Sequence, residues 1–401
     1  MKKYLHFLYG SAMMLMAISC TEDFVGQPST DKVPPSSIQE SNVIPMPGGA
    51  KISYQLPNET DISYVKGVYN VKGVEYVVRT SVYSDTLRIE GLGSADPLEV
   101  TLYVVDHSEN VSAPHKVTFT PKTPIIDLII NSLKLQADFG GVNTKWTNEL
   151  GTEVGITLMA TNDKGEMEEG ETFYNQMKEG QFSFRGYNDE PRKFSVYVTD
   201  KWGNVSKTTE AVELKPLYEK LLDRTKFKRH ILPVDNTTNY SGSYTFEKMF
   251  DNNTGSFWAN AGGATAPFYF TIDLGVEAQL SRFKLYHRPG SFYYKNSNVK
   301  NFEVWGTTVD KKDAGLLEDY WKDGWKKDPD WELLGDFTTF KPSGEGTQVT
   351  NEDKEYAQNG FEYNIPIEKK SVRYLRFQTK LNWSGAYGTE CAELMFWGND
   401  R

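Results

Sequence analysis

Three oxygen-bearing side chains stand close together in the second half of the chain. Asp251, Asn253 and Ser256 fall within six residues, with no basic residue among them. Ca²⁺ is a hard cation that takes six to eight oxygen ligands, backbone carbonyls included. The spacing therefore suits a structural calcium site, since no neighbouring group resembles a metal-activated nucleophile. The alternative is a metal-free turn in which Asp251 and Ser256 bond backbone amides.

Three other segments combine aromatic rings with planar hydrogen-bonding groups and lie between strand-like runs. These segments are residues 237–244, 287–298 and 382–388. A sugar stacks its CH-rich faces on aromatic rings, and its hydroxyls need polar partners. Loops on a rigid scaffold commonly carry recognition. The expected ligand-binding residues, three aromatic and three hydrogen-bonding, are Tyr293, Trp383, Tyr387, Arg288, Asn296 and Asn298. For any one of the rings, the alternative is a plug at the end of a sandwich.

A tryptophan-rich stretch, residues 316–331, runs among Lys and Asp residues. Leu317, Tyr320, Trp321 and Trp325 recur three and four apart, which is helical spacing. We favour a short amphipathic helix that packs its aromatic stripe on the rest of its domain. A second sugar platform or a docking surface is the alternative.

No catalytic constellation stands out. The histidines lack metal-ligand spacing, and the sequence has no Gly-x-Ser-x-Gly elbow and no Gly-rich phosphate loop before a helix. Acidic residues are plentiful, so a glycosidase carboxylate pair stays open, but we expect no enzyme. The net charge of −10 and the absence of a basic patch argue against nucleic acid as a partner. Cys391 is expected to be a buried small residue in a strand rather than a nucleophile.

The N-terminus has the pattern of a signal peptide. A basic start precedes the apolar run 4–18, which is too short to span a bilayer as a mature helix. The run leads into Cys20 through a sequence that resembles a lipoprotein cleavage box, although Ala17 replaces its commonest residue. Residues 1–19 are therefore predicted to be removed and Cys20 to be lipidated, with enough acyl chains for stable anchoring. The alternative is an ordinary secretory signal followed by an incidental cysteine.

The middle of the chain predicts β-modules. Short alternating runs separated by Gly, Asn, Asp and Pro are typical of antiparallel β-sandwiches. A repeat supports two of them, because a Tyr-centred strand ends in Asp106 and again in Asp200, and each Asp leads through Asn into Val-Ser. Asp and Asn suit such a turn because they bond their own backbone, and a calcium-binding turn is the alternative. The predicted segments are a tether at 20–37, sandwiches at 38–122 and 123–216, and a connector at 217–229.

The remaining segment, residues 230–401, carries six ordered motifs. They are residues 249–258, 268–275, 283–286, 302–306, 373–377 and 392–398. In this order they resemble the discoidin, or coagulation-factor type C, domain, a β-jelly-roll shared with galactose-binding-like modules. The predicted fold class is all-β, with two tandem immunoglobulin- or fibronectin type III-like sandwiches followed by a discoidin-like jelly-roll. The whole chain resembles outer-membrane lipoproteins of Bacteroidota polysaccharide-utilisation loci.

This resemblance implies a metal site. Sugar-binding discoidin modules build a structural calcium site from the turn at Asp251 and a glutamate near the C-terminus, and Glu393 matches that glutamate. Asn253 and Ser256 depart from the commoner Asp and Thr of the family, and one charge fewer weakens binding.

The resemblance also implies a role and a place. Glu22 and Asp23, just behind Cys20, resemble an export signal to the outer face of the outer membrane. The expected function is capture of a glycan, an oligo- or polysaccharide, at the cell surface, with an outer-membrane glycan transporter complex as a further partner. The alternative is a structural or adhesion lipoprotein that binds a partner protein or a host surface.

Overall fold

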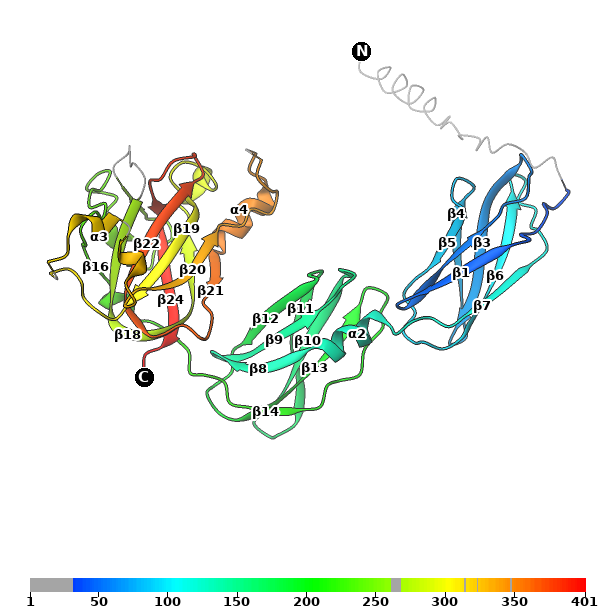
Figure 1. Ribbon diagram of the computed structural model, residues 1–401, viewed down its shortest axis with the longest axis horizontal. Helices are drawn as coiled ribbons and strands as arrows, with labels where there is room; N and C mark the ends of the chain where they lie inside the picture. The colour runs from blue at the N-terminus through cyan, green and yellow to red at the C-terminus, as the bar shows by residue number, and fades with distance from the viewer. Residues whose placement is uncertain (1–31, 261–267, 314, 323, 347) are drawn as a thin grey trace, which may run out of the picture. The chain divides into compact units, whose positions relative to one another are not determined.

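The computed structural model describes residues 32–401, apart from 261–267, 314, 323 and 347. Cys20, the expected signal peptide and the first part of the tether lie outside the described residues. β-strands joined by turns and a few short helices make up the described chain (Figure 1). Within this part of the chain, no helix combines the length and the apolar character needed to cross a membrane.

The described chain groups into two compact units. The first unit holds the residues up to Ile129 together with Thr152–Val154 and Val198–Ser206. The second unit holds the rest of the second sandwich and the whole C-terminal domain. Each unit is described by itself below.

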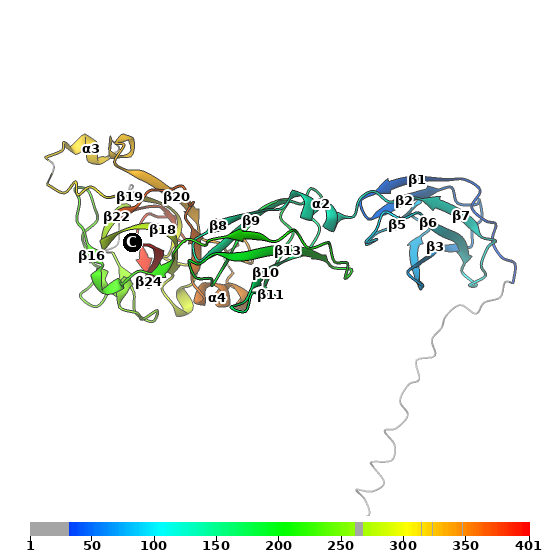
Figure 2. The ribbon, with the colours of Figure 1, turned by 90° about the horizontal axis from the view of Figure 1, so that it is seen from below.

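Two antiparallel sheets form the first sandwich, with strand orders β1-β2-β5 and β4-β3-β6-β7 (Figures 1 and 2). The strands are β1 Ser41–Met46, β2 Gly49–Tyr54, β3 Ile62–Val71, β4 Val74–Ser81, β5 Thr86–Ile89, β6 Leu98–Asp106 and β7 His115–Phe119. Side chains alternate between the two faces of a strand. In β5, Leu87 and Ile89 are therefore buried while Arg88 between them is exposed. The predicted sandwich is confirmed.

The second sandwich also has two sheets, ordered β11-β10-β13-β14 and β12-β9-β8. The strands are β8 Lys134–Asp138, β9 Gly141–Thr147, β10 Val154–Thr161, β11 Met167–Asn175, β12 Glu179–Arg185, β13 Arg192–Asp200 and β14 Val212–Leu214. The helix α2, Ile125–Ser132, precedes it and was not anticipated from the sequence. Ile126 and Ile129 bury one side of α2 while Leu128 stays exposed, so packing rather than a long helical pattern defines this helix.

The repeated turn has the same construction in both sandwiches. Asp106 Oδ1 accepts hydrogen bonds from the N–H groups of Ser108 and Asn110, both at 2.8 Å. Asp200 Oδ1 likewise accepts from Trp202 at 3.0 Å and Asn204 at 2.9 Å. In each turn the Asn side chain donates to the second carboxylate oxygen at 2.9 Å. The predicted hairpin is confirmed, with each Asp carboxylate satisfied by the turn's own amides.

The C-terminal domain has an eight-stranded sheet with the path β15-β24-β18-β22-β19-β20, to which β16 and β21 are added along β18, and a small sheet β17-β23. The strands are β15 Lys220–Leu221, β16 Lys228–Arg229, β17 Trp258–Ala259, β18 Phe268–Tyr286, β19 Val299–Thr307, β20 Glu332–Thr338, β21 Phe361–Asn364, β22 Val372–Asn382, β23 Glu390–Cys391 and β24 Glu393–Asn399. The helices are α3 Glu318–Lys322 and α4 Asn351–Gln358, with 3-10 turns η1 Arg224–Lys226, η2 Phe246–Phe250, η3 Gly290–Phe292 and η4 Gly324–Lys327. Helices α3 and α4 lie on opposite sides of the domain (Figures 1 and 2).

The long strand β18 closes this domain. Its first half pairs with β22 up to Asp273, the register then shifts before Ala278, and its second half pairs with β24. Gly275 adopts a left-handed φ of 67° at the bend, and its N–H donates to Asp273 Oδ1 at 2.8 Å. One strand thus serves both layers, as the predicted jelly-roll requires. Aromatic rings fill the space between, including Phe270 stacked on Phe377 with centroids 4.8 Å apart.

The tryptophan-rich stretch packs onto the sheet around one buried arginine. Trp321, Trp325 and Trp331 are all buried, and the guanidinium of Arg376 lies 5.3 Å from the ring of Trp321 and 4.7 Å from that of Trp325. Arg376 is fully buried and donates to Asp235 Oδ1 at 2.8 Å. The favoured interpretation of this stretch, a short helix packing its aromatic stripe on the domain, is confirmed. Its tryptophans are therefore no sugar platform.

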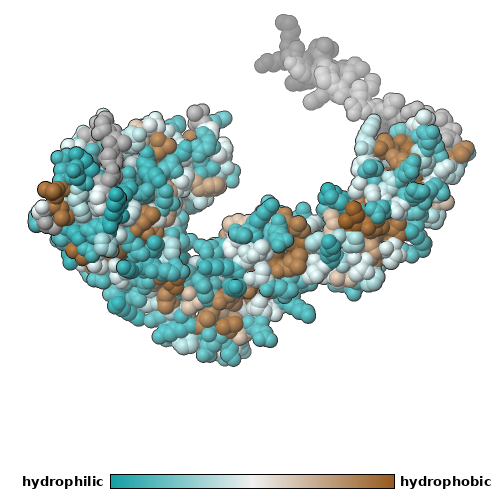
Figure 3. Space-filling view, viewed as in Figure 1, coloured by the Kyte–Doolittle hydropathy of each residue, from teal (hydrophilic) through white to brown (hydrophobic). Residues whose placement is uncertain are grey.

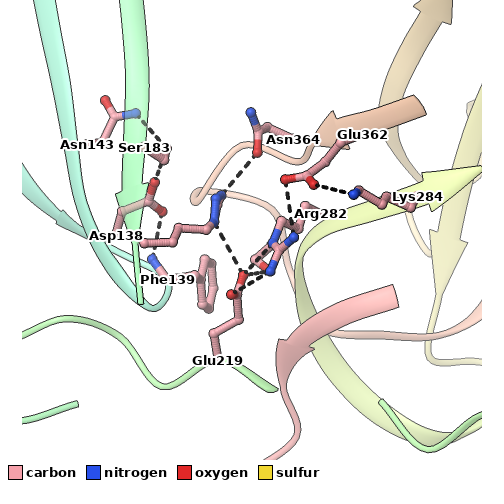
Figure 4. A network of polar contacts seen from close by, with 11 residues as sticks. Asp138, Phe139, Asn143, Ser183, Glu219, Arg282, Lys284, Glu362 and Asn364 are labelled. Carbon is pink, nitrogen blue, oxygen red and sulfur yellow. Dashed lines mark hydrogen bonds and ion pairs between the residues drawn. The ribbon is translucent and has the colours of Figure 1, made fainter. Parts of the chain in front are cut away.

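Within the second unit, a polar network centred on Glu219 links the second sandwich to the jelly-roll (Figure 4). Its carboxylate lies 3.6 Å from Arg185 Nε and 3.2 Å from Arg282 Nη2, and the Glu219 side chain is 8 % exposed. Arg185 also donates to Asn364 Oδ1 at 3.0 Å, and Arg282 pairs with Glu362 at 3.2 Å. The carboxylate therefore joins β12 of the second sandwich to β18 of the C-terminal domain, and the two arginines extend the network to β21.

Candidate functional site

Backbone hydrogen bonds bring the three predicted loop segments together at one end of the jelly-roll. Tyr240 N–H donates to Ala259 O at 2.9 Å, which ties the first loop to β17. Strand β17 pairs with β23, and Glu390 N–H at the start of β23 donates to Ser297 O at 2.7 Å in the second loop. The third loop leads directly into Glu390. Segments about 150 residues apart in the sequence thus form one surface.

Arg288 is the most firmly placed of the predicted ligand-binding residues. Its Nη1 donates to Glu390 Oε1 at 2.9 Å. The rings of Phe257 and Phe292 lie 4.5 Å and 3.5 Å from its guanidinium carbon. The Arg288 side chain is 21 % exposed. An ion pair and two aromatic faces fix the guanidinium, so little rotamer entropy remains to be lost when a ligand binds.

A row of aromatic rings extends from this arginine. Phe257, beside Arg288, stacks on Tyr244 with centroids 4.6 Å apart and planes at 25°. Tyr244 in turn meets Tyr240 at 6.1 Å. Tyr240 is 68 % exposed. The row thus leads from a held guanidinium to one exposed ring, Tyr240, through two half-buried rings.

The sequence analysis selected the loop that carries Tyr240 and Tyr244 but named neither residue, and it did not select Phe257. Each belongs to a segment with no periodic pattern, and only the pairing of β17 with β23 brings them to Arg288. The signal that was available is the clustering of aromatic residues in a loop between predicted strands.

Glu390 supplies the negative partner of the site. Burial raises the pKa of its carboxyl, while Arg288 and the N–H of Ser297 act in the opposite direction. Its Oε2 is buried without a hydrogen-bond partner among the described residues. Oε1 holds Arg288, so Glu390 orients the guanidinium.

Two of the predicted ligand contacts are wrong because the side chains are buried. Asn298 is fully buried, where its Oδ1 accepts from Arg288 N–H at 2.7 Å and its Nδ2 donates to Phe292 O at 2.8 Å. Its amide therefore shapes the loop and has no capacity left for a sugar. Tyr293 is 8 % exposed and belongs to the aromatic core. In both cases a loop residue that has polar and apolar parts packs inside the domain instead of facing solvent.

The other three predicted residues lie near the surface. Asn296 is exposed, with a left-handed φ of 54°. Tyr387 is 37 % exposed and precedes Gly388, which approaches Ser297 and Asn260. Trp383 is half-buried and packs edge-on against Tyr294 at 5.1 Å, with Lys300 Nζ 4.8 Å from its ring centroid. Asn296 and Tyr387 remain candidates for ligand contact, whereas Trp383 mainly covers the core.

The expected calcium residues come together, but with two basic side chains among them. Asp251 accepts from Ser256 Oγ at 2.7 Å and pairs with Lys248 at 3.2 Å. Glu393 accepts from Asn253 N–H at 3.3 Å and pairs with Arg224 Nη1 at 2.7 Å.

Arg224 lies among the residues that the sequence analysis assigned to calcium. Its Nη2 also donates to Asn252 Oδ1 at 2.7 Å, so the guanidinium bridges Glu393 and the turn. The described residues contain no group of three or more His, Cys, Asp or Glu suited to a metal ion. In this structure Arg224 is therefore the cationic partner of the buried carboxylate, and calcium at this turn stays a prediction. The metal-free turn is the arrangement that these contacts favour.

Two other titratable groups take no part in the site. Cys391 is a free thiol buried in β23, and burial raises its pKa well above the usual range. The expectation of a cysteine buried in a strand is confirmed. His287 is buried next to Arg288, and burial lowers its pKa to about 3, so it stays neutral; its Nε2–H donates to Val299 O at 3.0 Å.

The chain matches three family profiles, each described as a domain of unknown function. Residues 35–121 match DUF4959, residues 122–225 match DUF5126 and residues 246–398 match DUF5000. No curated protein matches the chain.

Solved structures also resemble the chain. A SusE-like protein is 30% identical to it, over 69% of this chain and 100% of that one, with a TM-score of 0.43. A carbohydrate-binding module of family 32 from a Clostridium perfringens family 31 glycoside hydrolase is 17% identical over 45% of this chain and 95% of its own, with a TM-score of 0.33. The family 32 module of Clostridium perfringens NanJ, solved with galactose, is 11% identical over 45% and 98%, with a TM-score of 0.30.

Proposed function

Because the chain belongs to the family of SusE-like proteins, we propose that it is a surface lipoprotein that binds glycan through the Arg288 end of its C-terminal domain. The family membership confirms the resemblance to polysaccharide-utilisation lipoproteins that the motifs indicated. The observation that carries the proposal is a guanidinium held by Glu390 beside the aromatic row Tyr240, Tyr244 and Phe257, in which Tyr240 is exposed and the other two rings are half-buried.

The chemistry of this end suits a sugar. An arginine is a permanent donor with several N–H groups in a fixed plane, which match the oxygens of neighbouring hydroxyls. The aromatic rings offer faces for the CH groups of a pyranose ring. Because Glu390 compensates the charge of Arg288, the pair presents hydrogen bonds without a strong net field. These features favour a hydroxyl-rich ligand over a phosphate or a nucleic acid.

Affinity gel electrophoresis tests the proposal. The chain without residues 1–20 is run through native gels that contain starch, xylan, galactan, mannan or no polysaccharide. We expect one of these polysaccharides to retard migration, and the retardation to be lost in Arg288→Ala and strongly reduced in Tyr240→Ala. Tyr174→Ala is the matched control, because Tyr174 is 71 % exposed but lies on β11 of the second sandwich. Circular dichroism of each variant confirms that it is folded.

Retardation that survives both Arg288→Ala and Tyr240→Ala would place the binding elsewhere and refute this site. If no polysaccharide retards the chain and a protein partner is captured, the structural or adhesion role would be favoured instead.

The proposal includes the place of the protein in the cell. Lipid on Cys20 would anchor the chain, and Glu22 and Asp23 would direct it to the outer face of the outer membrane, where a glycan transporter complex is the expected partner. Cys20→Ser is expected to move the protein from the membrane fraction to the soluble fraction. Protease treatment of intact cells is expected to degrade the wild-type protein, and protection would contradict surface exposure.

A further inference from the structure

A groove of about 720 Å³ lies in the first unit, far along the chain from Arg288. Its walls are the edge strand β4 of one sheet, the end of β5 in the other sheet, and the loop that follows β5. The turn at Trp202 and Asn204, which groups with the first unit, closes one side. Ligand-binding pockets have volumes of about 300–1,000 Å³, so the groove is large enough for a ligand.

Two glycines allow the closing turn to approach. A Cβ on Gly91 would lie 2.5 Å from Cγ of Trp202, and a Cβ on Gly93 would lie 2.3 Å from Oδ1 of Asn204. Asn204 Nδ2 donates to Gly91 O at 2.9 Å and to Asp200 Oδ2 at 2.9 Å. The sequence therefore has glycine at the two positions where a side chain would push this turn away. Both glycines allow the close packing that forms this wall of the groove.

The groove presents aromatic faces to solvent. Tyr76 is 46 % exposed and stacks on the buried Tyr69, with centroids 5.5 Å apart and planes at 13°. This stacking holds the ring of Tyr76 in one orientation, as a platform needs. Trp202, which lines the groove from the closing turn, is 40 % exposed. Over the whole face shown in Figure 3, which does not single out the groove, hydrophobic residues form small patches among hydrophilic ones.

The polar residues of the groove balance in charge. Lys72 and Arg88 are basic, and Glu90 and Asp96 are acidic, so two positive and two negative groups give a formal charge of zero. Arg88 and Glu90 are paired at 3.8 Å. A balanced set of donors and acceptors between aromatic faces selects against a polyanion and suits a neutral, hydroxyl-rich ligand.

We propose that this groove is a second carbohydrate site, which binds a segment of a neutral polysaccharide on the Tyr76 platform. The choice of a carbohydrate rests on the proposed function, whereas the groove and its walls do not depend on it. Two sites on one chain would raise the affinity for a long polysaccharide above that for a short oligosaccharide, because the second contact becomes intramolecular.

The test compares single-site variants of the chain without residues 1–20. Tyr76→Ala removes the platform of the groove, and Arg288→Ala removes the site in the C-terminal domain. Tyr83→Ala is the control, because Tyr83 is 97 % exposed on the same sandwich outside the groove. The probes are the polysaccharide that retards the wild-type chain most and a short oligosaccharide prepared from it, titrated by calorimetry.

We expect the wild-type chain to bind two oligosaccharides, and Tyr76→Ala and Arg288→Ala to bind one each. Each variant should lose at least about tenfold in affinity for the polysaccharide, which a single lost aromatic or arginine anchor commonly causes. Tyr83→Ala should behave as wild type. Quenching of tryptophan fluorescence by the oligosaccharide should decrease in Trp202→Phe, which provides a second readout if Tyr76→Ala is poorly folded.

The outcomes separate the two proposals. Unchanged stoichiometry and affinity in Tyr76→Ala, with binding abolished in Arg288→Ala, would overturn the groove and leave the proposed function intact. The reverse pattern would overturn the Arg288 site and support the groove. No binding of any polysaccharide by the wild-type chain would refute both.

Discussion

Replacing Arg224 by methionine tests whether an arginine stands in for a metal ion in the C-terminal domain. Glu393 is 1 % exposed and its main charged partner is Arg224, which is 16 % exposed. Removing one partner of a buried ion pair costs about 3–5 kcal/mol. Because Arg224 is partly solvated and Asn253 N–H still reaches Glu393, we expect a loss just below that range, about 2–3 kcal/mol. For a domain of this size, that loss lowers Tm by about 4–12 °C.

The stability loss of Arg224→Met should also depend on pH. Burial raises the pKa of Glu393, and Arg224 opposes that rise. Without Arg224 the pKa rises further, so the charged carboxylate is the costly form in the folded state. The stability deficit of Arg224→Met should therefore be largest near neutral pH and shrink as the pH falls through the raised pKa of Glu393. A stability deficit of equal size at neutral pH and at a pH below the pKa of Glu393 would contradict this account.

Thermal unfolding with EDTA and with millimolar Ca²⁺ completes the test. The wild-type Tm should not respond to either, whereas Ca²⁺ should partly restore Arg224→Met, because removal of the guanidinium leaves Glu393 facing the oxygen-rich turn. Lys248→Met is the control, since its pair with Asp251 lies at the surface and is worth less than about 1 kcal/mol. A wild-type Tm that falls with EDTA and recovers with Ca²⁺ would refute the reasoning and support the calcium expectation.

Three further predictions concern the junction, a helix cap and catalysis. Glu219→Ala leaves Arg185 and Arg282 without the carboxylate that they share. Trypsin should therefore cleave the connector around Lys215 faster in this variant than in Glu213→Ala, a control at an exposed position. Equal cleavage rates in the two variants would count against a fixed junction. Although Asp353 is buried, hydrogen bonds from Ser343 and Thr350 lower its pKa. The contribution of Asp353 to stability should therefore be present above about pH 4 and lost as the pH falls below that value. Asp353→Asn should flatten the acid side of a Tm–pH curve, and a curve that stays as steep as that of the wild type would refute this. The purified protein should release no reducing sugar from the polysaccharide that it binds, and measurable release would overturn the expectation that it is not an enzyme.

The fold class was predictable because strand patterns are local. Alternation of side chains identifies a half-buried strand whatever its partners are, and the Asp106 and Asp200 turns use bonds within five residues. Helix α2 was missed because eight residues are too few to establish a helical period against neighbouring strands. The tryptophan-rich stretch was identified correctly because its spacing is helical.

The site was only partly predictable, because exposure is a property of the assembled domain. Arg288 was identified, but Asn298 in the same loop is consumed by the loop's own backbone. Tyr240 and Phe257 reach the site through the β17–β23 pairing, which joins segments more than 130 residues apart. The calcium expectation considered the turn and Glu393 but not Arg224, which precedes the turn by 27 residues and joins Glu393 only in the folded domain.

The sequence by itself determined the all-β architecture, the lipoprotein-like start and the loops in which recognition residues lie, because these depend on short-range periodicity and local motifs. The tertiary structure alone decided which loop residues face solvent, which cation neutralises Glu393 and that Tyr76 and Trp202 line one groove. The physical reason is that burial, ion pairing and ring stacking act between atoms close in space, and in this protein those atoms come from segments far apart in the chain.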